Sequence, residues 1–266
     1  MQDRKFKIIA IANQKGGVGK TTTGVNLSTA IAAIHKKCLL IDLDPQSNAS
    51  TALGFEYSSG ASTIYDVMIG KSSINQATHK TIIPKLSAVL STVDLTAAEL
   101  ELVSKPGWQY ILKAALKEAV QDYDYIFIDC PPSLGLLTTN ALTAADTVII
   151  PMQCEFFALE GLNHLFEAIK LVQHKLNPEL YVSGVLLTMH DKRSSLNLKV
   201  AKDVRTQLGK LVYDTVIPRN ISLSEATLHG KPALIYDYEC MGSRAYMHLA
   251  KEILERNSGA PGGFSI

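Results

Sequence analysis

The chain has 266 residues, 47% of them hydrophobic, which is enough for one large domain with a buried core. Its formal net charge is +1, so any basic surface must be local rather than a property of the whole chain. No apolar run is long enough to span a bilayer, and the apolar stretch 8–12 is too short for a signal peptide. Four scattered cysteines without a C-x-x-C pair are typical of reduced thiols in a cytoplasmic protein.

Strand and helix patterns alternate along the chain, and the apolar runs are not interrupted by regularly spaced polar residues. This is typical of a parallel sheet covered on both faces, so the sequence predicts a doubly wound α/β fold with a mainly parallel sheet. The predicted elements are a strand at 7–12, a helix at 21–37, strands at 38–44, 123–132 and 146–153, a helix at 155–176, a strand at 181–189, a helix at 194–208 and a strand at 211–218.

Residues 45–110 have a less regular pattern, and no elements are predicted there. We expect residues 1–256 to form a single domain. Within it, residues 240–256 should form a helix that packs on the core. The Gly/Pro-rich residues 257–266 should form a flexible tail.

The segment NQKGGVGKTTT, residues 13–23, lies between the first predicted strand and the first predicted helix and is typical of a phosphate-binding loop. Backbone N–H groups and the helix N-terminus attract anions there, and glycines let the backbone approach phosphate oxygens. Lys20 should reach the β- and γ-phosphates, the Thr21 hydroxyl should bind Mg²⁺ directly, and Thr22 should donate to an α-phosphate. The predicted nucleotide-binding residues of this loop are Gly16, Gly17, Val18, Gly19, Lys20, Thr21 and Thr22.

The loop departs from the usual G-x-x-x-x-G-K-[ST] pattern. When the pattern is aligned on Gly19, Lys20 and Thr21, Gln14 occupies the position of the first glycine, and a second lysine, Lys15, follows it.

Aspartates end two other predicted strands, where parallel sheets bind ligands. Asp129 ends the apolar strand within YIFIDCPPS, the Walker B arrangement, and is predicted to hold Mg²⁺ through water. Asp44, in LLIDLDPQSNAS, is predicted to position or deprotonate the attacking water and to contact Mg²⁺ through water. For Asp44 alone a turn before Pro45 would explain the residue, but the neighbouring phosphate loop favours catalysis. Asp42 is expected only to support the loop.

These three motifs, KGGVGKTTT, LLIDLDPQSNAS and YDYIFIDCPPSLGLLTTNAL, together resemble the ParA/Soj partition ATPases, P-loop proteins with a deviant Walker A motif. VIIPMQCEFFALEGL, GVLLTMHDKRSSL, VIPRNISLSEA and HGKPALIYD extend the resemblance over about residues 7–256. The Walker A form alone is shared with MinD-like proteins, and the later segments narrow the resemblance to the ParA/Soj type.

The resemblance implies ATP and Mg²⁺ as cofactors and an ATP-bound homodimer in which Lys15 reaches the nucleotide of the other subunit. Lys15, Lys20 and Asp44 are then the catalytic residues. Adenine is expected near Met189, Pro218 and Asn220, with Thr188 close by, and the absence of an N/T-K-x-D guanine motif agrees with ATP over GTP.

Residues 189–231 contain eight Lys/Arg but four Asp/Glu, a local basic excess. The resemblance implies that ATP-bound dimers bind double-stranded DNA there without sequence preference, mainly through phosphate contacts. The predicted DNA-binding residues are Arg193, Lys199, Lys202, Arg219 and Lys231. Three departures from the family are Ser222, which replaces an arginine used for DNA, Thr227, which replaces a proline, and Ser47, which replaces a glycine.

We therefore expect a cytoplasmic ATPase that segregates chromosome or plasmid DNA, associates with the nucleoid when ATP-bound and is stimulated by a ParB-type centromere-binding protein. The first alternative is a MinD-like or cargo-positioning ATPase. No membrane partner is expected, because nothing after Arg256 is basic. Two further alternatives are a reductase-type relative with a cysteine-bound iron–sulfur cluster, which the scattered cysteines disfavour, and a non-enzymatic DNA-binding module, which the intact phosphate motifs disfavour.

Overall fold

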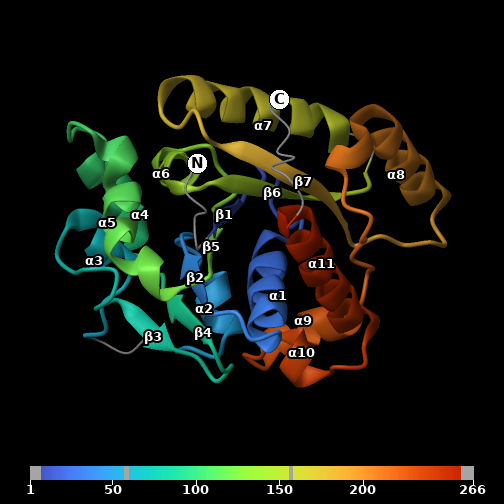
Figure 1. The fold of residues 1–266 in the computed structure, drawn as a ribbon, viewed down its shortest axis with the longest axis horizontal. Helices are drawn as coiled ribbons and strands as arrows, with labels where there is room; N and C mark the ends of the chain where they lie inside the picture. Colours follow the sequence, from blue (N-terminus) through green and yellow to red (C-terminus); the bar gives the residue numbers. More distant parts are fainter. Residues whose placement is uncertain (1–6, 57–59, 156–157, 259–266) are drawn as a thin grey trace.

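The computed structural model describes residues 7–56, 60–155 and 158–258, and it contains a seven-stranded sheet between two layers of helices (Figure 1). The strand order is β3-β4-β2-β5-β1-β6-β7. Every neighbouring pair is parallel except β3–β4 at one edge, which is antiparallel. The predicted doubly wound, mainly parallel α/β fold is confirmed.

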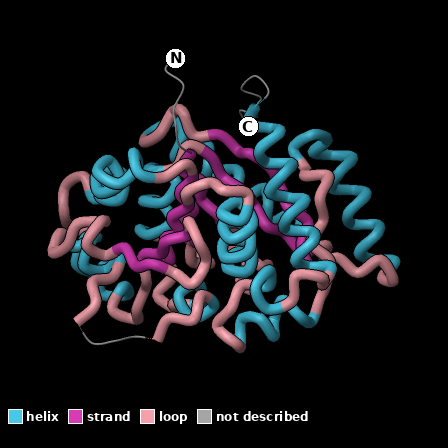
Figure 2. The backbone as a smooth tube through the Cα atoms, turned by 60° about the horizontal axis from the view of Figure 1, so that its bottom comes forward, coloured by secondary structure: helices cyan, strands magenta, loops and turns pink. Residues whose placement is uncertain are grey.

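The strands are short and largely buried, as their runs of aliphatic residues predict. Figure 2 shows them as a central layer with helices around it. Their bounds are β1 (Lys7–Ile11), β2 (Cys38–Asp42), β3 (Thr78–Lys80), β4 (Leu86–Val89), β5 (Tyr125–Asp129), β6 (Thr147–Gln153) and β7 (Tyr181–Thr188).

The helices occupy both faces of the sheet. Their bounds are α1 (Lys20–Ala33), α2 (Asn48–Ala52), α3 (Ile64–Ile69), α4 (Leu95–Leu102), α5 (Ile111–Ala119), α6 (Leu136–Ala144), α7 (Ala158–Lys175), α8 (Ser195–Leu208), α9 (Ile221–Leu228), α10 (Ala233–Tyr236) and α11 (Met241–Ser258). Three single-turn 3-10 helices lie at Trp108–Tyr110, Val120–Asp122 and Gly209–Leu211.

Two hydrophobic clusters divide the core between these faces. Successive residues of β1 point to opposite sides of the sheet, so Ile8 and Ala10 join the cluster of α3 to α8. Ile9 and Ile11 join the cluster of α1, α2, α9, α10 and α11. A parallel sheet buried on both faces needs apolar residues at every position, which explains the uninterrupted runs in the sequence.

Several predicted helices are confirmed with small shifts in their ends. The helix predicted at 21–37 is α1, and those predicted at 155–176 and 194–208 are α7 and α8. The helix predicted at 240–256 is α11, whose Tyr246, Leu249 and Ile253 are buried in the core.

The strand predicted at 211–218 is wrong. This segment follows β7 through only two isolated parallel bridges, Val185–Val212 and His190–Pro218. The backbone N–H groups of Asp214 and Thr215 donate instead to the Glu252 carboxylate of α11, at 2.8 and 2.9 Å. The ladder is therefore interrupted by a side chain from another element, which a local sequence pattern does not reveal. Strands β3 and β4, within the irregular 45–110 region, were not predicted.

The C-terminal helix α11 continues through Ser258, and residues 259–266 of the predicted tail lie outside the described residues. Within the described ranges, no helix is both long enough and apolar enough to cross a bilayer. All four cysteines are buried and have free thiols.

Gly184 in β7 makes room for Tyr213, a fully buried side chain whose hydroxyl bonds to Ser183 at 2.7 Å. A Cβ at position 184 would lie 2.6 Å from Tyr213 Cε2 and 3.0 Å from the Leu211 carbonyl oxygen. We expect Gly184→Ala to lower the free energy of unfolding by about 1–3 kcal/mol, because the tyrosine must move in a close-packed core. Urea denaturation measures this change.

The control is Gly161→Ala, on an exposed turn of α7, where an added Cβ meets no atom within 4 Å. It should be neutral or stabilising by about 0.5–1 kcal/mol, the helix-propensity gain. An equal loss of stability in both variants would contradict the packing explanation.

Candidate nucleotide-binding site

The carboxyl ends of the parallel strands bring the predicted site residues to one edge of the sheet. In the register, Asp129 of β5 lies between Asp42 of β2 and Ile11 of β1, after which the glycine loop begins. β1 and β6 are neighbours, but the chain leaves them in opposite directions, toward β2 and toward β7. Such a switch point creates the crevice in which open α/β sheets bind ligands.

The glycine loop is held in place by side chains from β6 and β7. Gly17 and Gly19 have φ angles of 72° and 86°, a left-handed conformation that glycine adopts without steric cost. The Thr188 hydroxyl donates to the Val18 carbonyl at 2.8 Å, and the Gln153 amide donates to the Gly17 carbonyl at 3.0 Å. A Cβ at Gly17 would meet no atom within 4 Å, so space for a ligand remains beside the loop.

The two lysines of the loop occupy different environments. Lys20 is 6% exposed, and its ammonium group donates to the Lys15 carbonyl at 3.1 Å. Burial lowers the pKa of Lys20, while the negative charge of Asp129 opposes this shift. Lys15 has a half-exposed side chain that forms an ion pair with Glu155, just after β6. Lys20 therefore points along the loop interior, and Lys15 lies on the surface.

Asn13 fixes the start of the loop, a contribution that the motif did not predict. Its side-chain amide donates to the Pro151 carbonyl of β6 at 2.7 Å. Its side-chain oxygen accepts a hydrogen bond from the Lys15 backbone N–H at 3.0 Å. Gln153 at the end of β6 and Glu155 just after it also contact the loop. Neither contact was predicted, although both residues stand in the quoted segment VIIPMQCEFFALEGL.

Asp129 is a buried carboxylate without a hydrogen-bond partner. Its exposure is 0%, and neither carboxylate oxygen receives a hydrogen bond from the described residues. Burial raises its pKa well above the usual range, and the charge of Asp42 adds to this rise. The Thr21 hydroxyl and Lys20 oppose the rise, although the hydroxyl does not reach hydrogen-bonding geometry.

An unpartnered buried carboxylate is unfavourable unless a cation or a donor compensates it. Mg²⁺ prefers few carboxylate ligands and retains waters, so Asp129 beside the Thr21 hydroxyl fits such an ion.

Asp42 stabilises the loop that carries Asp44. One of its carboxylate oxygens accepts from the backbone N–H and the hydroxyl of Ser50, both at 2.8 Å. The other accepts from the Asp44 backbone N–H at 3.2 Å. Burial raises the pKa of Asp42 to about 6, despite these hydrogen bonds. The geometry fits the supporting role expected for Asp42.

Asp44 lies beside the phosphate loop in a tight turn. Its carboxylate is buried, accepts from the Gln46 backbone N–H at 2.9 Å, and is close enough to Lys20 to raise the pKa of that lysine. Ser47 closes the turn with φ 55° and ψ 28°, a left-handed conformation that costs a non-glycine residue about 1 kcal/mol or more. This conformation explains why the family pattern places glycine at that position.

The predicted adenine residues lie on adjacent segments at the same sheet edge. A Cβ at Gly19 would lie 3.8 Å from both Thr188 and Met189, so the end of β7 borders the phosphate loop. The bridge between His190 and Pro218 places the later segment beside it. Asn220 precedes α9, and its side-chain oxygen is buried without a partner among the described residues, so it can accept a hydrogen bond from a ligand.

The five basic residues predicted to bind DNA are all exposed. Arg193 pairs with Asp191 through two hydrogen bonds of 3.0 and 2.9 Å, and this pairing lowers the pKa of Asp191 to about 2. Lys199 and Lys202 lie on α8, whereas Arg219 and Lys231 flank α9. Figure 1 shows α8 and α9 in separate parts of the C-terminal half. Arg219 nevertheless lies near the Asp191–Arg193 pair, because its backbone N–H donates to the His190 carbonyl at 3.1 Å and its charge also lowers the pKa of Asp191.

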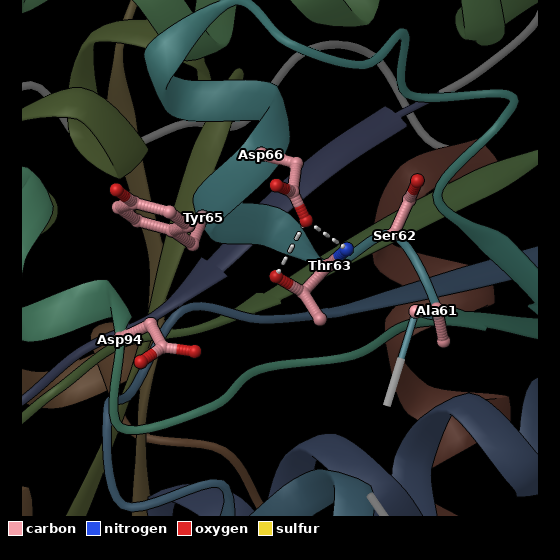
Figure 3. A pocket seen from close by; sticks show the side chains of 7 residues that line it. Ala61, Ser62, Thr63, Tyr65, Asp66 and Asp94 are labelled. Atoms are coloured by element: carbon pink, nitrogen blue, oxygen red, sulfur yellow. Dashed lines mark hydrogen bonds between the residues drawn. The ribbon is translucent and has the colours of Figure 1, made fainter. Parts of the chain in front are cut away.

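A hollow of about 240 Å³ lies away from the glycine loop, at the start of α3 (Figure 3). Its lining includes Thr63, Asp66 and Asp94. The Asp66 carboxylate accepts from the Thr63 backbone N–H at 2.9 Å and from its hydroxyl at 3.2 Å. Thr63 and Asp66 thus cap the helix and satisfy each other, and Asp94 accepts from the Thr92 hydroxyl at 3.2 Å, so this hollow does not indicate a second ligand site.

Comparison with known proteins agrees with this geometry. A family model described as "AAA domain" matches residues 6–182. The chromosome partitioning protein ParA of Caulobacter vibrioides is 51% identical over 259 residues, which cover 96% of this chain and 97% of that protein. The chromosome-partitioning ATPase Soj of Treponema pallidum is 47% identical over 251 residues, covering 94% of this chain and 98% of its own.

Among solved structures, cobyrinic acid a,c-diamide synthase from Mycobacterium smegmatis, with a bound ATP analogue and magnesium, superposes with a TM-score of 0.84. It is 34% identical and the alignment covers 98% of this chain and 100% of that one. Fold, phosphate loop and full-length relatives lead to the same assignment: the chain belongs to the ParA/Soj family of chromosome-partitioning ATPases.

Proposed function

We propose that this protein is a cytoplasmic DNA-partitioning ATPase that uses ATP and Mg²⁺ as a switch between a DNA-bound dimer and a free monomer. The observation that carries this proposal is the unpartnered, fully buried Asp129 carboxylate beside Lys20 and Thr21 at the switch point of the sheet. A nucleotide–metal complex supplies both the cation that Asp129 lacks and the phosphates that the lysine and the loop N–H groups attract.

Within the site, each side chain has a distinct task. Lys20 holds the β- and γ-phosphates, and the Gly16–Gly19 backbone surrounds them through its N–H groups. Mg²⁺, when bound, neutralises charge that develops on the phosphate oxygens; Thr21 would hold it directly and Asp129 through water. Asp44, buried in its turn, orients the attacking water and accepts its proton.

Lys15 acts in trans in this proposal. Its side chain is half exposed and leaves the loop on the surface, where its one ion pair among the described residues is the exposed pair with Glu155. Exposed ion pairs contribute about 0–1 kcal/mol, so Lys15 can exchange Glu155 for a phosphate of a second subunit at little cost. A cation at that position offsets repulsion between two facing γ-phosphates and stabilises transition-state charge.

The ATP-bound dimer is proposed to bind DNA through Arg193, Lys199, Lys202, Arg219 and Lys231, all of which are exposed. Dimerisation doubles the number of basic contacts and aligns separate groups along one duplex, which compensates for their spread over the monomer. A ParB-type centromere-binding partner then stimulates hydrolysis and releases the subunits. α11 packs against α1 and buries its apolar side, which disfavours a membrane-binding role for this helix.

Asp44→Ala should slow ATP hydrolysis by about 10²-fold or more, because the attacking water loses its base and its orientation. We expect the variant to accumulate as an ATP-bound dimer that retains nonspecific DNA and releases it steeply as salt rises. Sedimentation and DNA retention with ATP and with ADP measure both properties. The control is Asp122→Ala, an exposed aspartate that precedes β5 at the end of the strand opposite Asp129. A monomeric Asp44→Ala protein in ATP would count against the assignment.

Lys15→Ala should reduce partner-stimulated hydrolysis at least about tenfold while leaving the Kd for ATP of the monomer nearly unchanged, because Lys15 contributes to the other subunit's site. Steady-state hydrolysis and fluorescent-nucleotide binding separate the two effects. The control is Lys36→Ala, an exposed lysine just beyond the opposite end of α1. If Lys15→Ala weakened nucleotide binding by the monomer as much as it weakened hydrolysis, Lys15 would act in its own site.

Asp129→Asn should change stability and ligand response in opposite directions. Because burial raises the pKa of Asp129, the folded protein retains a proton that the unfolded chain loses near pH 4. The free energy of unfolding without nucleotide therefore falls as pH rises from about 4 through the folded-state pKa. Asparagine removes this contribution, so the nucleotide-free variant should unfold at higher temperature at about pH 8.

The same substitution should reduce the increase in unfolding temperature that Mg²⁺ and ATP produce, because the metal loses its carboxylate partner. Thermal unfolding at about pH 5 and about pH 8, with and without Mg²⁺ and ATP, measures both effects, with Asp122→Asn as the matched control. An unchanged ligand response in Asp129→Asn would remove this residue from the metal site.

A further inference from the structure

The ends of α2 and α9 meet through two glycines whose backbones touch. A Cβ at Gly54 would lie 2.7 Å from the Gly230 carbonyl oxygen, and a Cβ at Gly230 would lie 2.8 Å from Gly54 Cα. The Thr51 carbonyl oxygen is 3.5 Å from that second Cβ. Both glycines have left-handed φ angles, 81° and 60°. No side chain separates the two segments here, so a displacement of one backbone cannot be absorbed by a rotamer change.

The opposite ends of the same two helices face the proposed nucleotide site. α2 starts directly after the turn of Asp44 and Ser47, which lies on the phosphate side. α9 starts directly after Asn220, whose unpartnered oxygen lies on the base side. The two helices are also in contact with each other. The glycine contact therefore joins two short helices that begin at the two ends of one nucleotide.

Two of the exposed basic residues flank α9, the helix that the glycine contact joins to α2. Arg219 precedes Asn220 and α9, and Lys231 directly follows Gly230. The turn between α9 and Lys231 is fixed by backbone hydrogen bonds, from Gly230 N–H to the Thr227 carbonyl at 3.0 Å and from Lys231 N–H to the Ala226 carbonyl at 3.0 Å. A shift of Gly230 must therefore carry Lys231 with it.

The turn that precedes α2, on the phosphate side of the site, contains a strained residue. Ser47 keeps a φ of 55° at the start of α2, and the Asp44 carboxylate is committed to the Gln46 N–H in the same turn. If Asp44 binds a catalytic water, its carboxylate must weaken or lose the hydrogen bond to the Gln46 N–H. The strain at Ser47 then favours a rearrangement of the turn. A strained turn beside the ligand is a segment whose arrangement a bound nucleotide can bias.

We propose that the Gly54–Gly230 contact couples the nucleotide state sensed by the Asp44 turn to the position of the basic residues that flank α9. This inference rests on the proposed function, in which those residues bind DNA. Gly54 and Gly230 are positioning residues: they touch neither nucleotide nor DNA, and their contact transmits the displacement of α2 to α9.

The first test is Gly230→Ala, which forces the two backbones apart. Its control is Gly70→Ala at the end of α3, where φ is 84° and an added Cβ meets no atom within 4 Å. The control therefore imposes the same kind of backbone strain without a clash. Both variants are examined with Mg²⁺ and either a non-hydrolysable ATP analogue or ADP, for nucleotide binding, sedimentation and affinity for a random-sequence duplex.

We expect Gly230→Ala to bind the analogue and dimerise like the control, but to lose the preference of its analogue-bound form for DNA by about tenfold, a typical coupling factor. If both variants keep the same ratio of DNA affinities between analogue and ADP, the proposal is overturned.

Hydrogen exchange on the unmodified protein provides the second test and does not depend on the variant folding. The amides of residues 226–231 should change their exchange rates between analogue and ADP, together with those of residues 46–54. A change confined to 46–54 would overturn the coupling. If the unmodified protein binds no DNA with either nucleotide, the proposed DNA function fails, while the exchange at 226–231 still decides whether the two helices are coupled.

Discussion

The buried carboxylate of Asp129 is the constraint on which the nucleotide site depends. It stands at the end of a central strand, between Asp42 on one side and the start of the glycine loop on the other, with no exposure to solvent. An anion in this position is strongly disfavoured unless it is protonated or paired. The charge of Lys20 compensates part of the negative charge of Asp129. Lys20 is itself buried, however, and this burial lowers its pKa. The site thus contains a buried carboxylate that lacks a partner until a nucleotide and a divalent cation bind. Such a group lowers the stability of the free protein but serves binding, a common conflict at active sites.

The sequence predicted those parts of the fold and site that depend on local pattern. Uninterrupted aliphatic runs such as residues 38–42 require burial on both faces, and a strand that leads through glycines into a helix has few uses other than phosphate binding. Asp42 and Asp129 could be placed at one edge because the carboxyl ends of parallel strands coincide. In each case the physical cause lies within a few residues of the chain, so the sequence alone carries the information.

Contacts between distant segments could not be predicted in this way. The segment 211–218 has a strand-like composition, yet the Glu252 carboxylate from α11 binds two of its N–H groups and breaks the ladder. Asn13 and Gln153 shape the glycine loop through bonds that span more than 130 positions of the sequence. Ser47 is an intermediate case. The sequence shows that serine replaces the family's glycine, but only the φ of 55° shows that the position requires a left-handed backbone. Local motifs therefore predict that a site exists, whereas hydrogen bonds between distant segments determine its detailed geometry.

In the dimer that we propose, the two lysines of the loop act in the sites of two different subunits. Lys20 is nearly enclosed and bonded to the loop backbone, so its charge acts inside its own site. Lys15 emerges at the surface, where its pairing with Glu155 is exposed and therefore weak. A lysine in such a weak ion pair can exchange its partner for a stronger anion, and in the proposed dimer the nucleotide of the second subunit is that anion. In the dimer that we propose, the catalytic unit is larger than the folding unit, because Lys15 of one chain completes the site of the other.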